Sequence, residues 1–389
     1  MCREHWRICD RMGQCDRNTS TLIFCAWNSM KGNVEIMAEN IRMDSHKLIY
    51  HPDVVARWLK GENIYPIEIE ISPSGVCNHR CIFCAVDYIG YKPDFLRKEI
   101  ILRDISQMSQ KGLKSVICSG EGEPLLNKNM PDIANGIKAC GVDAAMSTNG
   151  VLFTREVAEE CLKAFTWIRF SVASMEEESY YKIQKGKDGD LDKVKANLAE
   201  AVKVKKDNNL KTTLGVQCLL LPDNMDQLPH MAKQLREIGV DYLTIKPYSQ
   251  HLHSENKFEV NYEEMLDLEQ DLKQYAAEDF AIYFRANAMK KMHHEKCYRQ
   301  CFGLPFMTHI DARGNVWPCV AHIGTEEFCY GNIYEQTFEE LWEGTKRQEI
   351  IKKLNCLDIN KVCREACRLD EINKYLDELK HPGEHVNFI

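Results

Sequence analysis

The sequence predicts an α/β protein: an incomplete (β/α)6 barrel followed by a small hairpin-plus-helix domain. Two observations support this prediction. Between residues 65 and 250, six segments of strand length alternate with segments whose apolar residues recur at helical spacing, which is typical of parallel βαβ units with right-handed crossovers. Further along, seven of the chain's 18 cysteines lie between Cys297 and Cys367. We therefore expect an N-terminal extension of unknown role (1–60), a barrel (61–285) and a cysteine-rich domain (286–389).

The predicted elements of the barrel follow in order along the chain. Residues 65–72 alternate apolar and charged side chains, the period of a strand. Residues 154–165 and 190–202 carry apolar side chains at helical spacing, and 53–60 predicts a short amphipathic helix before the first strand. The six predicted strands are 65–72, 113–119, 143–150, 167–174, 212–221 and 241–247.

Directly after the first strand, Cys77, Cys81 and Cys84 have the spacing C-x3-C-x2-C. Three thiolates this close can hold three irons of a [4Fe–4S] cube and leave the fourth iron open to an outside ligand. A structural zinc site would instead need a fourth protein ligand, usually from a second cysteine pair. The motif also follows the carboxyl end of a strand, where α/β sheets and barrels gather their chemistry.

With Phe83 between its last two cysteines, this motif resembles that of the radical S-adenosylmethionine (SAM) superfamily. The resemblance implies a [4Fe–4S] cluster whose open iron binds the amino and carboxylate groups of SAM. The turn 120–124 resembles the family's GGEP motif, with Gly122 allowing close approach of the backbone and Glu123 contacting the SAM amino group. Glu121 departs from the pattern, because the family usually has glycine there.

The resemblance extends to later strand ends. Asn149, followed by Gly150, matches a turn that borders the ribose of SAM in the family, and Ser147 and Ser171 are expected in the same cofactor site. Lys182 occupies a position where relatives often place an arginine that reaches a carboxylate of the substrate or cofactor. A lysine can supply the charge but not the bidentate contact.

The cysteine-rich segment resembles the auxiliary-cluster domains called SPASM and twitch. It predicts a hairpin that turns at 313–315, with Cys301 before it and Cys319 at its end. The resemblance implies that Cys363 and Cys367, in the later run C-x3-C, complete the ligands of one auxiliary [4Fe–4S] cluster. Structural zinc at these cysteines is the alternative, since C-x3-C pairs also bind zinc.

The number of auxiliary clusters follows from the remaining cysteines. A second cluster would need four further thiolates, including one after Cys367, and the chain has none there. We therefore expect one auxiliary cluster. The alternative that Cys297 or Cys356 replaces Cys363 as a ligand stays open. The cysteines of this segment left without an assignment are Cys297, Cys329 and Cys356.

The resemblance also implies the chemistry. Reductive cleavage of SAM, with an electron donor such as flavodoxin or ferredoxin, gives a 5′-deoxyadenosyl radical that abstracts hydrogen from an unactivated carbon. We expect a small sugar-like or nucleotide-linked substrate that is oxidised through the auxiliary cluster, because peptide-modifying relatives often carry a longer module before the barrel. The alternatives are a peptide-modifying enzyme and a redox-neutral epimerase, for which Cys329 is the candidate hydrogen donor. A simple electron carrier would not explain Glu123 or Asn149.

The composition favours a soluble, cytoplasmic enzyme. A chain of 389 residues has room for two domains, and grouped cysteines in a reducing compartment fit metal clusters. No apolar stretch has the length of a membrane span, and a formal charge of -8 argues against a general nucleic-acid binder. Four cysteines near the N-terminus have spacings that match no motif: Cys2, Cys9, Cys15 and Cys25.

Overall fold

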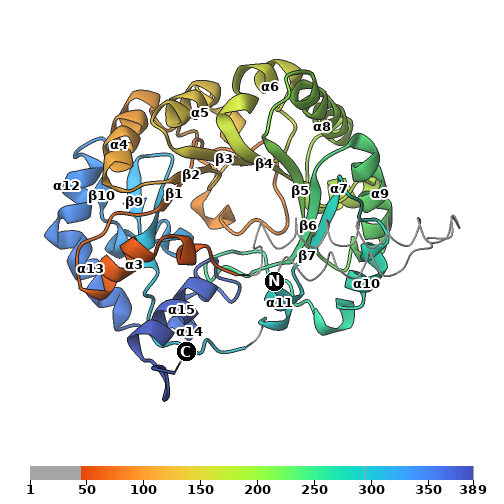
Figure 1. Cartoon of the computed structure of the whole chain (residues 1–389). Coiled ribbons are helices and arrows are strands. Elements are labelled where there is room, and N and C mark those ends of the chain that lie inside the picture. Colours follow the sequence, from red (N-terminus) through yellow and green to blue (C-terminus); the bar gives the residue numbers. More distant parts are fainter. Residues whose placement is uncertain (1–44, 293, 389) are drawn as a thin grey trace, which may run out of the picture. The chain divides into compact units, whose positions relative to one another are not determined.

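The computed structural model describes residues 45–292 and 294–388, so the four N-terminal cysteines lie outside the described residues (Figure 1). The strands of the described part are β1 (Glu68–Ile71), β2 (Ser115–Cys118), β3 (Asp143–Thr148), β4 (Phe165–Ser171), β5 (Thr213–Leu220), β6 (Tyr242–Pro247), β7 (Ala281–Phe284), β8 (Met307–Ile310), β9 (Asn315–Trp317) and β10 (Gly331–Asn332). Within that part they form a ten-stranded sheet in the order β10-β9-β8-β1-β2-β3-β4-β5-β6-β7. The pairings from β8 through β7 are parallel, and those of β9 are antiparallel.

Helices join the strands and cover one face of the sheet. The helices of the described part are α3 (Pro52–Leu59), α4 (Lys98–Lys111), α5 (Met130–Ala139), α6 (Arg155–Cys161), α7 (Glu177–Gln184), α8 (Asp190–Asp207), α9 (Leu228–Ile238), α10 (Leu268–Lys273), α11 (Ala286–Lys290), α12 (Phe338–Glu343), α13 (Thr345–Asn355), α14 (Ile359–Val362) and α15 (Asp370–Lys380). Figure 1 shows α4, α5, α6, α8 and α9 along the outer side of the curved sheet. The three predicted helices coincide with α3, α6 and α8. Thr154 caps α6, because its side chain accepts a hydrogen bond from the backbone of Val157.

The predicted fold class is confirmed, since all six predicted strands coincide with β1 to β6. The sheet also extends beyond the prediction at both edges. At one edge β7 pairs with β6, and at the other β8 lies parallel to β1, with His309 opposite Glu70. The predicted hairpin, β8 and β9, is present and continues the barrel sheet across the expected boundary near residue 285.

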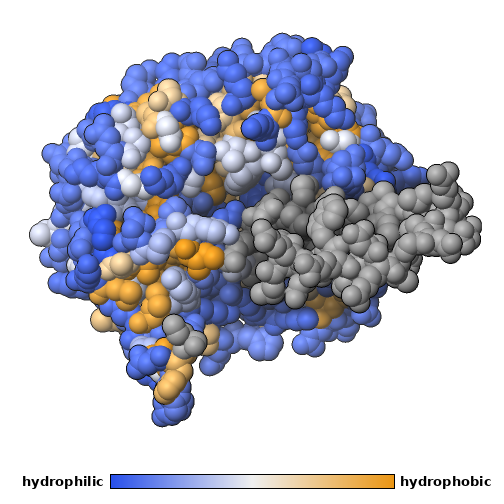
Figure 2. All heavy atoms as spheres, in the orientation of Figure 1, coloured by the Kyte–Doolittle hydropathy of each residue, from blue (hydrophilic) through white to orange (hydrophobic). Residues whose placement is uncertain are grey.

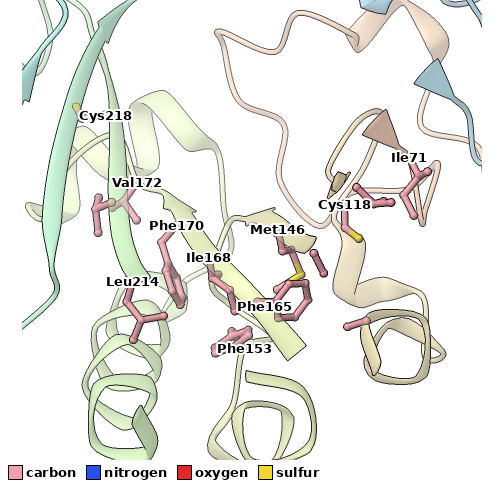
Figure 3. Packing of buried hydrophobic residues seen from close by; sticks show 14 of the residues in the cluster. Ile71, Cys118, Met146, Phe153, Phe165, Ile168, Phe170, Val172, Leu214 and Cys218 are labelled. Atoms are coloured by element: carbon pink, nitrogen blue, oxygen red, sulfur yellow. The ribbon is translucent and has the colours of Figure 1, made fainter. Parts of the chain in front are cut away.

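Alternation along the strands divides the core from the concave side of the sheet. Ile71 of β1 and Ile168 and Phe170 of β4 are fully buried, and Figure 3 shows them among other apolar side chains between sheet and helices. Successive side chains of a strand point to opposite faces, so Glu70 and Arg169 lie on the concave side. Burial of each large apolar side chain contributes about 1.5–3 kcal/mol, which holds the helices on the outer face and leaves the other face to polar residues.

A second, smaller apolar cluster lies beside α3 and α15. It contains Val55 of α3, Leu376 of α15 and Phe306, which precedes β8. Figure 2 shows a largely hydrophilic face on which apolar residues gather over α3 and the turn before it, where Ile49 and Tyr50 are exposed. Among the residues described, no helix is both long and apolar enough to cross a membrane.

Candidate active site

Cys77, Cys81 and Cys84 lie in the loop that follows β1, and their side chains are close enough to affect one another electrostatically. Burial, with the charges of Glu123 and Cys84, raises the pKa of Cys77 to about 12. Burial also raises the pKa of Cys81, and the charges of Cys77 and Cys84 add to the shift. Thiols that oppose one another's ionisation become thiolates together only when a cation lies among them. This donor set therefore fits three irons of a cube.

The loop is anchored between α7 and α8. The Arg80 backbone N–H donates to the carbonyl of Gln184, the last residue of α7, at 3.3 Å. His79 is buried, and its Nε2 lies 3.4 Å from Oδ2 of Asp190, the first residue of α8. The Arg80 guanidinium donates back to the Cys77 carbonyl at 2.6 Å. These contacts fix the cysteine positions before any metal binds.

Tyr91 contributes a hydrogen bond that sequence reasoning missed. Its hydroxyl hydrogen-bonds the Cys84 sulfur and opposes the rise that burial imposes on the pKa of Cys84. The Arg80 guanidinium lies 4.0 Å from the centroid of the Tyr91 ring. A hydroxyl that donates to a thiolate stabilises its charge. The sequence offers no signal for this contact, because no spacing rule relates Tyr91 to the cysteines.

Glu123 lies after β2 with its side chain buried. Its Oε1 accepts from the Thr148 hydroxyl at 2.6 Å and from the Leu125 backbone at 3.2 Å, and its Oε2 accepts from the Asn149 backbone at 2.7 Å. Burial raises the pKa of Glu123, and the hydrogen bonds from Asn149 and Thr148 oppose that rise. A carboxylate oxygen can accept two hydrogen bonds, so Oε2 has room for an ammonium group. Thr148 was not among the expected site residues.

Gly122 and Glu121 shape this turn in different ways. A Cβ on Gly122 would lie 2.1 Å from the carbonyl oxygen of Val76, so only glycine lets the turn pack against the cysteine loop. Glu121 is buried and accepts from the backbone N–H of Ala312 at 2.9 Å, in the turn between β8 and β9. The residue that departs from the family pattern therefore ties the site to the hairpin.

The structure brings the four predicted auxiliary ligands together. Cys301 precedes β8, Cys319 follows β9, and Cys363 and Cys367 lie between α14 and α15. Burial, with the charges of Cys367 and Cys363, raises the pKa of Cys301 to about 12. Burial, followed by the charges of Cys367, Cys301 and Cys363, raises the pKa of Cys319. Like Cys77, Cys81 and Cys84, these thiols therefore raise one another's pKa.

The other cysteines of the segment are placed differently. Cys297 and Cys356 are exposed. Cys363 is half-buried and its charge raises the pKa of Cys319, which favours Cys363 over the exposed Cys297 and Cys356 as the fourth proposed ligand. No three His, Cys, Asp or Glu side chains within 45–292 and 294–388 are arranged to hold a single metal ion. The thiolates of a cube each bind a different iron, so a cube spaces its ligands more widely than one ion does.

Tyr88 connects the segment that follows Cys84 to the segment that follows Cys319. It belongs to the segment that follows Cys84, and its hydroxyl donates to the Ile323 carbonyl at 2.9 Å. Its ring stacks on that of His251, with 4.6 Å between centroids. Burial raises the pKa of Tyr88, and the charge of Cys319 adds to the rise. The segment that follows the cysteine loop and the segment that follows the hairpin therefore meet at this residue.

Two family models match the chain. Residues 71–235 match the radical SAM superfamily, and residues 297–368 match the SPASM iron–sulfur cluster-binding domain. The chain contains a radical SAM domain followed by a SPASM domain. It is therefore an enzyme that uses SAM and a [4Fe–4S] cluster, and its SPASM domain implies auxiliary iron–sulfur chemistry. Both resemblances seen in the sequence are confirmed.

Named relatives cover much of this radical SAM enzyme at low identity. A "Probable GTP 3',8-cyclase" from Methanococcus maripaludis (strain C5) is 24% identical over 237 residues, covering 59% of this chain and 73% of that protein. An "AdoMet-dependent heme synthase" from Methanosarcina barkeri is 25% identical over 320 residues, covering 75% of this chain and 88% of that protein. The crystal structure of Streptococcus suis SuiB with SAM has a TM-score of 0.61 at 16% identity, covering 86% of this chain and 79% of SuiB. The last likeness shows the fold.

Ser147, Ser171 and Asn149, the other residues expected to contact SAM, lie on or directly after β3 and β4. Ser147 lies opposite Arg169 in the pairing of β3 with β4, and Ser171 ends β4, so both belong to the concave side. The Asn149 side chain donates to Asn78 Oδ1 at 2.7 Å, inside the cysteine loop. These three residues stay proposed cofactor contacts.

Lys182 does not lie in the site. Its side chain is 61% exposed, and Nζ is 2.6 Å from Oδ1 of Asp223. The helix α7 turns this position toward solvent, where the surface aspartate satisfies the ammonium group. The expected contact between Lys182 and a carboxylate of the substrate or cofactor is therefore not supported.

Cys329 lines a cavity of about 400 Å³ between the segment after the cysteine loop and the hairpin. Tyr88 and Trp317 also line it. The Cys329 thiol donates to the Gly331 carbonyl at 3.5 Å, and burial raises its pKa. A protonated thiol is the form that a hydrogen donor needs, so its role as donor in the epimerase alternative stays a proposal.

Proposed function

We propose that this enzyme abstracts a hydrogen atom from an unactivated carbon of a small, sugar-like or nucleotide-linked substrate and oxidises that substrate by two electrons. The observation that supports the proposal is the position of Tyr88, which lies four residues after Cys84 and whose hydroxyl donates to the carbonyl of Ile323, four residues after Cys319. An electron acceptor held by the auxiliary cysteines would then lie near the carbon that reacts.

Cys77, Cys81 and Cys84 would hold the cluster and Glu123 would hold the ammonium group of SAM; together the two groups would supply hydrogen-abstracting radical chemistry, with one electron from a donor such as flavodoxin or ferredoxin. The protein's task is to hold SAM and substrate in a fixed, water-poor geometry, which orientation-dependent catalysis requires. Glu123 orients the ammonium group of SAM through its Oε2, and Asn149 holds the turn beside it. Oxidation by two electrons would remove a hydrogen atom from the substrate and then one electron and one proton, with the auxiliary site accepting the electron and solvent the proton.

The nucleotide-linked substrate is supported by one named relative, whose printed name gives GTP as the molecule it cyclises. The alternative, a peptide substrate, is favoured by a different observation. SuiB, which shares this fold, has been crystallised with its precursor peptide SuiA. At 16% identity that likeness concerns the fold, so we keep the small molecule as the main proposal.

The two proposals differ in an isotope experiment. The reconstituted enzyme would be reduced with dithionite and given SAM with an extract from cells grown in deuterated medium, separated into small-molecule and peptide fractions. We expect deuterium in 5′-deoxyadenosine from the small-molecule fraction, and a substrate product lighter by two hydrogens. Transfer from the peptide fraction alone would contradict the proposal, and a product of unchanged mass would contradict oxidation.

A further inference from the structure

The concave side of the sheet carries basic side chains that the cofactors do not account for. Arg169 lies on β4 and Lys246 on β6. Each alternates with residues of the apolar core, such as Ile168 and Ile245, whose side chains are fully buried. Arg169 and Lys246 therefore point to the concave side, where Ser147 lies opposite Arg169.

Further cations surround Lys246. Burial, and after it the charges of four arginines, hold the pKa of Lys246 well below its usual value. Two of the four follow the auxiliary cysteines Cys363 and Cys367 in sequence, so both domains contribute to this basic cluster. The four are Arg169, Arg285, Arg364 and Arg368.

Some of this charge has partners. The Arg368 guanidinium is 2.9 Å from Glu70 Oε2 and 3.5 Å from Glu68 Oε1. Arg364 donates to the carbonyl of Ser249 at 2.9 Å. It also follows Cys363, so part of its charge offsets that of the thiolates.

Arg169 and Lys246 are different. Neither forms an ion pair with any residue in the described ranges, and Nε of Arg169 has no hydrogen-bond acceptor there. The Arg169 guanidinium lies 5.0 Å from the Trp167 ring, which leaves its N–H groups available. The charge of Glu70 reaches Arg169 from beyond ion-pair distance, but two buried cations on one concave face that lack an ion pair of their own still favour an anion between them.

Two buried hydroxyl groups also lack partners, that of Tyr283 on the concave side of β7 and that of Ser249 in the loop after β6. Tyr283 is 8% exposed, and its hydroxyl has no hydrogen-bond partner among the described residues; the same holds for Oγ of Ser249. The Tyr283 ring packs edge-on against Tyr242, whose own ring fills the space above Gly215. Buried polar groups are normally satisfied, so these hydroxyls are further donors for a bound oxyanion.

We propose that Arg169 and Lys246, together with Arg364, bind a phosphate group of the substrate. The inference rests on the proposed function and makes its substrate a phosphorylated sugar or nucleotide. A phosphate fits better than a carboxylate because its three terminal oxygens can accept from the guanidinium, ammonium and hydroxyl donors at once. Bound there, the phosphate would hold the substrate between the SAM residues and the auxiliary cysteines.

Inorganic pyrophosphate is the probe for this site. Its binding to the full-length, anaerobically reconstituted enzyme would be measured by titration calorimetry with saturating SAM, so that the open iron and the SAM site are filled. Lys246→Met and Arg169→Met keep much of the side-chain volume and remove one charge each. We expect each to weaken pyrophosphate binding about tenfold or more, as loss of a charge-assisted contact predicts. Lys182→Met, which removes a surface charge, is the matched control and should bind as the wild type does.

The outcomes separate this inference from the proposed function. Formation of 5′-deoxyadenosine with dithionite and without substrate measures SAM cleavage at the Cys77/Cys81/Cys84 site. If the wild-type enzyme forms no 5′-deoxyadenosine, the proposed function is contradicted. If SAM is cleaved normally and pyrophosphate fails to bind, or binds the two variants unchanged, the phosphate site is refuted. Competition between pyrophosphate and SAM would also refute it, because the basic cluster would then serve the cofactor. Tighter binding of succinate than of pyrophosphate would show a carboxylate site instead.

Discussion

Replacing Glu123 by glutamine tests the assignment of the SAM ammonium site most directly. The change removes one charge and keeps the shape. The amide oxygen can still accept from the Asn149 backbone, which leaves the NH₂ group facing Thr148 and Leu125. The Thr148 hydroxyl can rotate to accept, but the Leu125 N–H loses its acceptor, so we expect a stability loss of about 1 kcal/mol. The variant should therefore fold.

The effect on SAM should be larger than the effect on folding. A hydrogen bond to a charged group contributes about 1.5–3 kcal/mol, and about 1.4 kcal/mol corresponds to a tenfold change in affinity. Glu123→Gln should therefore bind SAM about 10–150-fold more weakly. Calorimetry on the reconstituted protein gives Kd, and 5′-deoxyadenosine formation at low and high SAM separates binding from cleavage.

Glu121 provides the matched control. It stands two residues before Glu123 in the same turn, but it accepts from Ala312 in the hairpin. Glu121→Gln keeps an acceptor for that N–H and should leave the affinity for SAM unchanged. An unaltered SAM Kd in a folded Glu123→Gln variant, or an equal loss in Glu121→Gln, would refute the assigned role of Glu123.

The remaining predictions concern the clusters. Cys81→Ala should abolish 5′-deoxyadenosine formation, because two thiolates cannot hold the cube; undiminished cleavage would exclude the assignment. With one cube at each site, iron analysis after reconstitution should find about eight irons per wild-type chain. The triple Cys77/Cys81/Cys84→Ala variant should retain about four irons. Retention of about eight irons in that variant would reveal a second auxiliary cluster. Cys319→Ala should fold less stably and transfer substrate hydrogen to 5′-deoxyadenosine without giving the oxidised product. Cys297→Ala should behave as the wild type, and normal product from a Cys319→Ala variant lacking the auxiliary cluster would refute the oxidase proposal.

The barrel and the cysteine groups could be predicted because their signals are local. The alternation of apolar and charged side chains predicted β1, and the spacing of Cys77, Cys81 and Cys84 predicted that they share a cluster. β7 was missed because Ala281–Phe284 is a four-residue segment of a kind that also occurs in loops. The pairing of β8 with β1 was missed for another reason: the partner of a strand depends on tertiary packing, which no local pattern encodes.

The same distinction explains the site residues. Glu123 was found through its motif, whereas Thr148, which holds its carboxylate, carries no signal apart from its neighbour Asn149. Lys182 was wrongly expected in the site, because a sequence position does not say which side of a helix faces solvent. Arg169 and Lys246 are separated by 77 positions in sequence, and the strand order β4-β5-β6 brings both to the face of the sheet where we propose the phosphate site.

The position of β8 in the sheet limits where the chain can be truncated without exposing a strand edge. β8 covers the side of β1 opposite to β2, and β1 leads into the cysteine loop. A truncated chain that ends before Met307 would leave β1 with a row of unpaired N–H and C=O groups. Such an edge strand recruits other chains, so the isolated barrel should aggregate rather than persist as a single-cluster enzyme. Evolution could therefore have lost the auxiliary cysteines more readily than the hairpin that presents them.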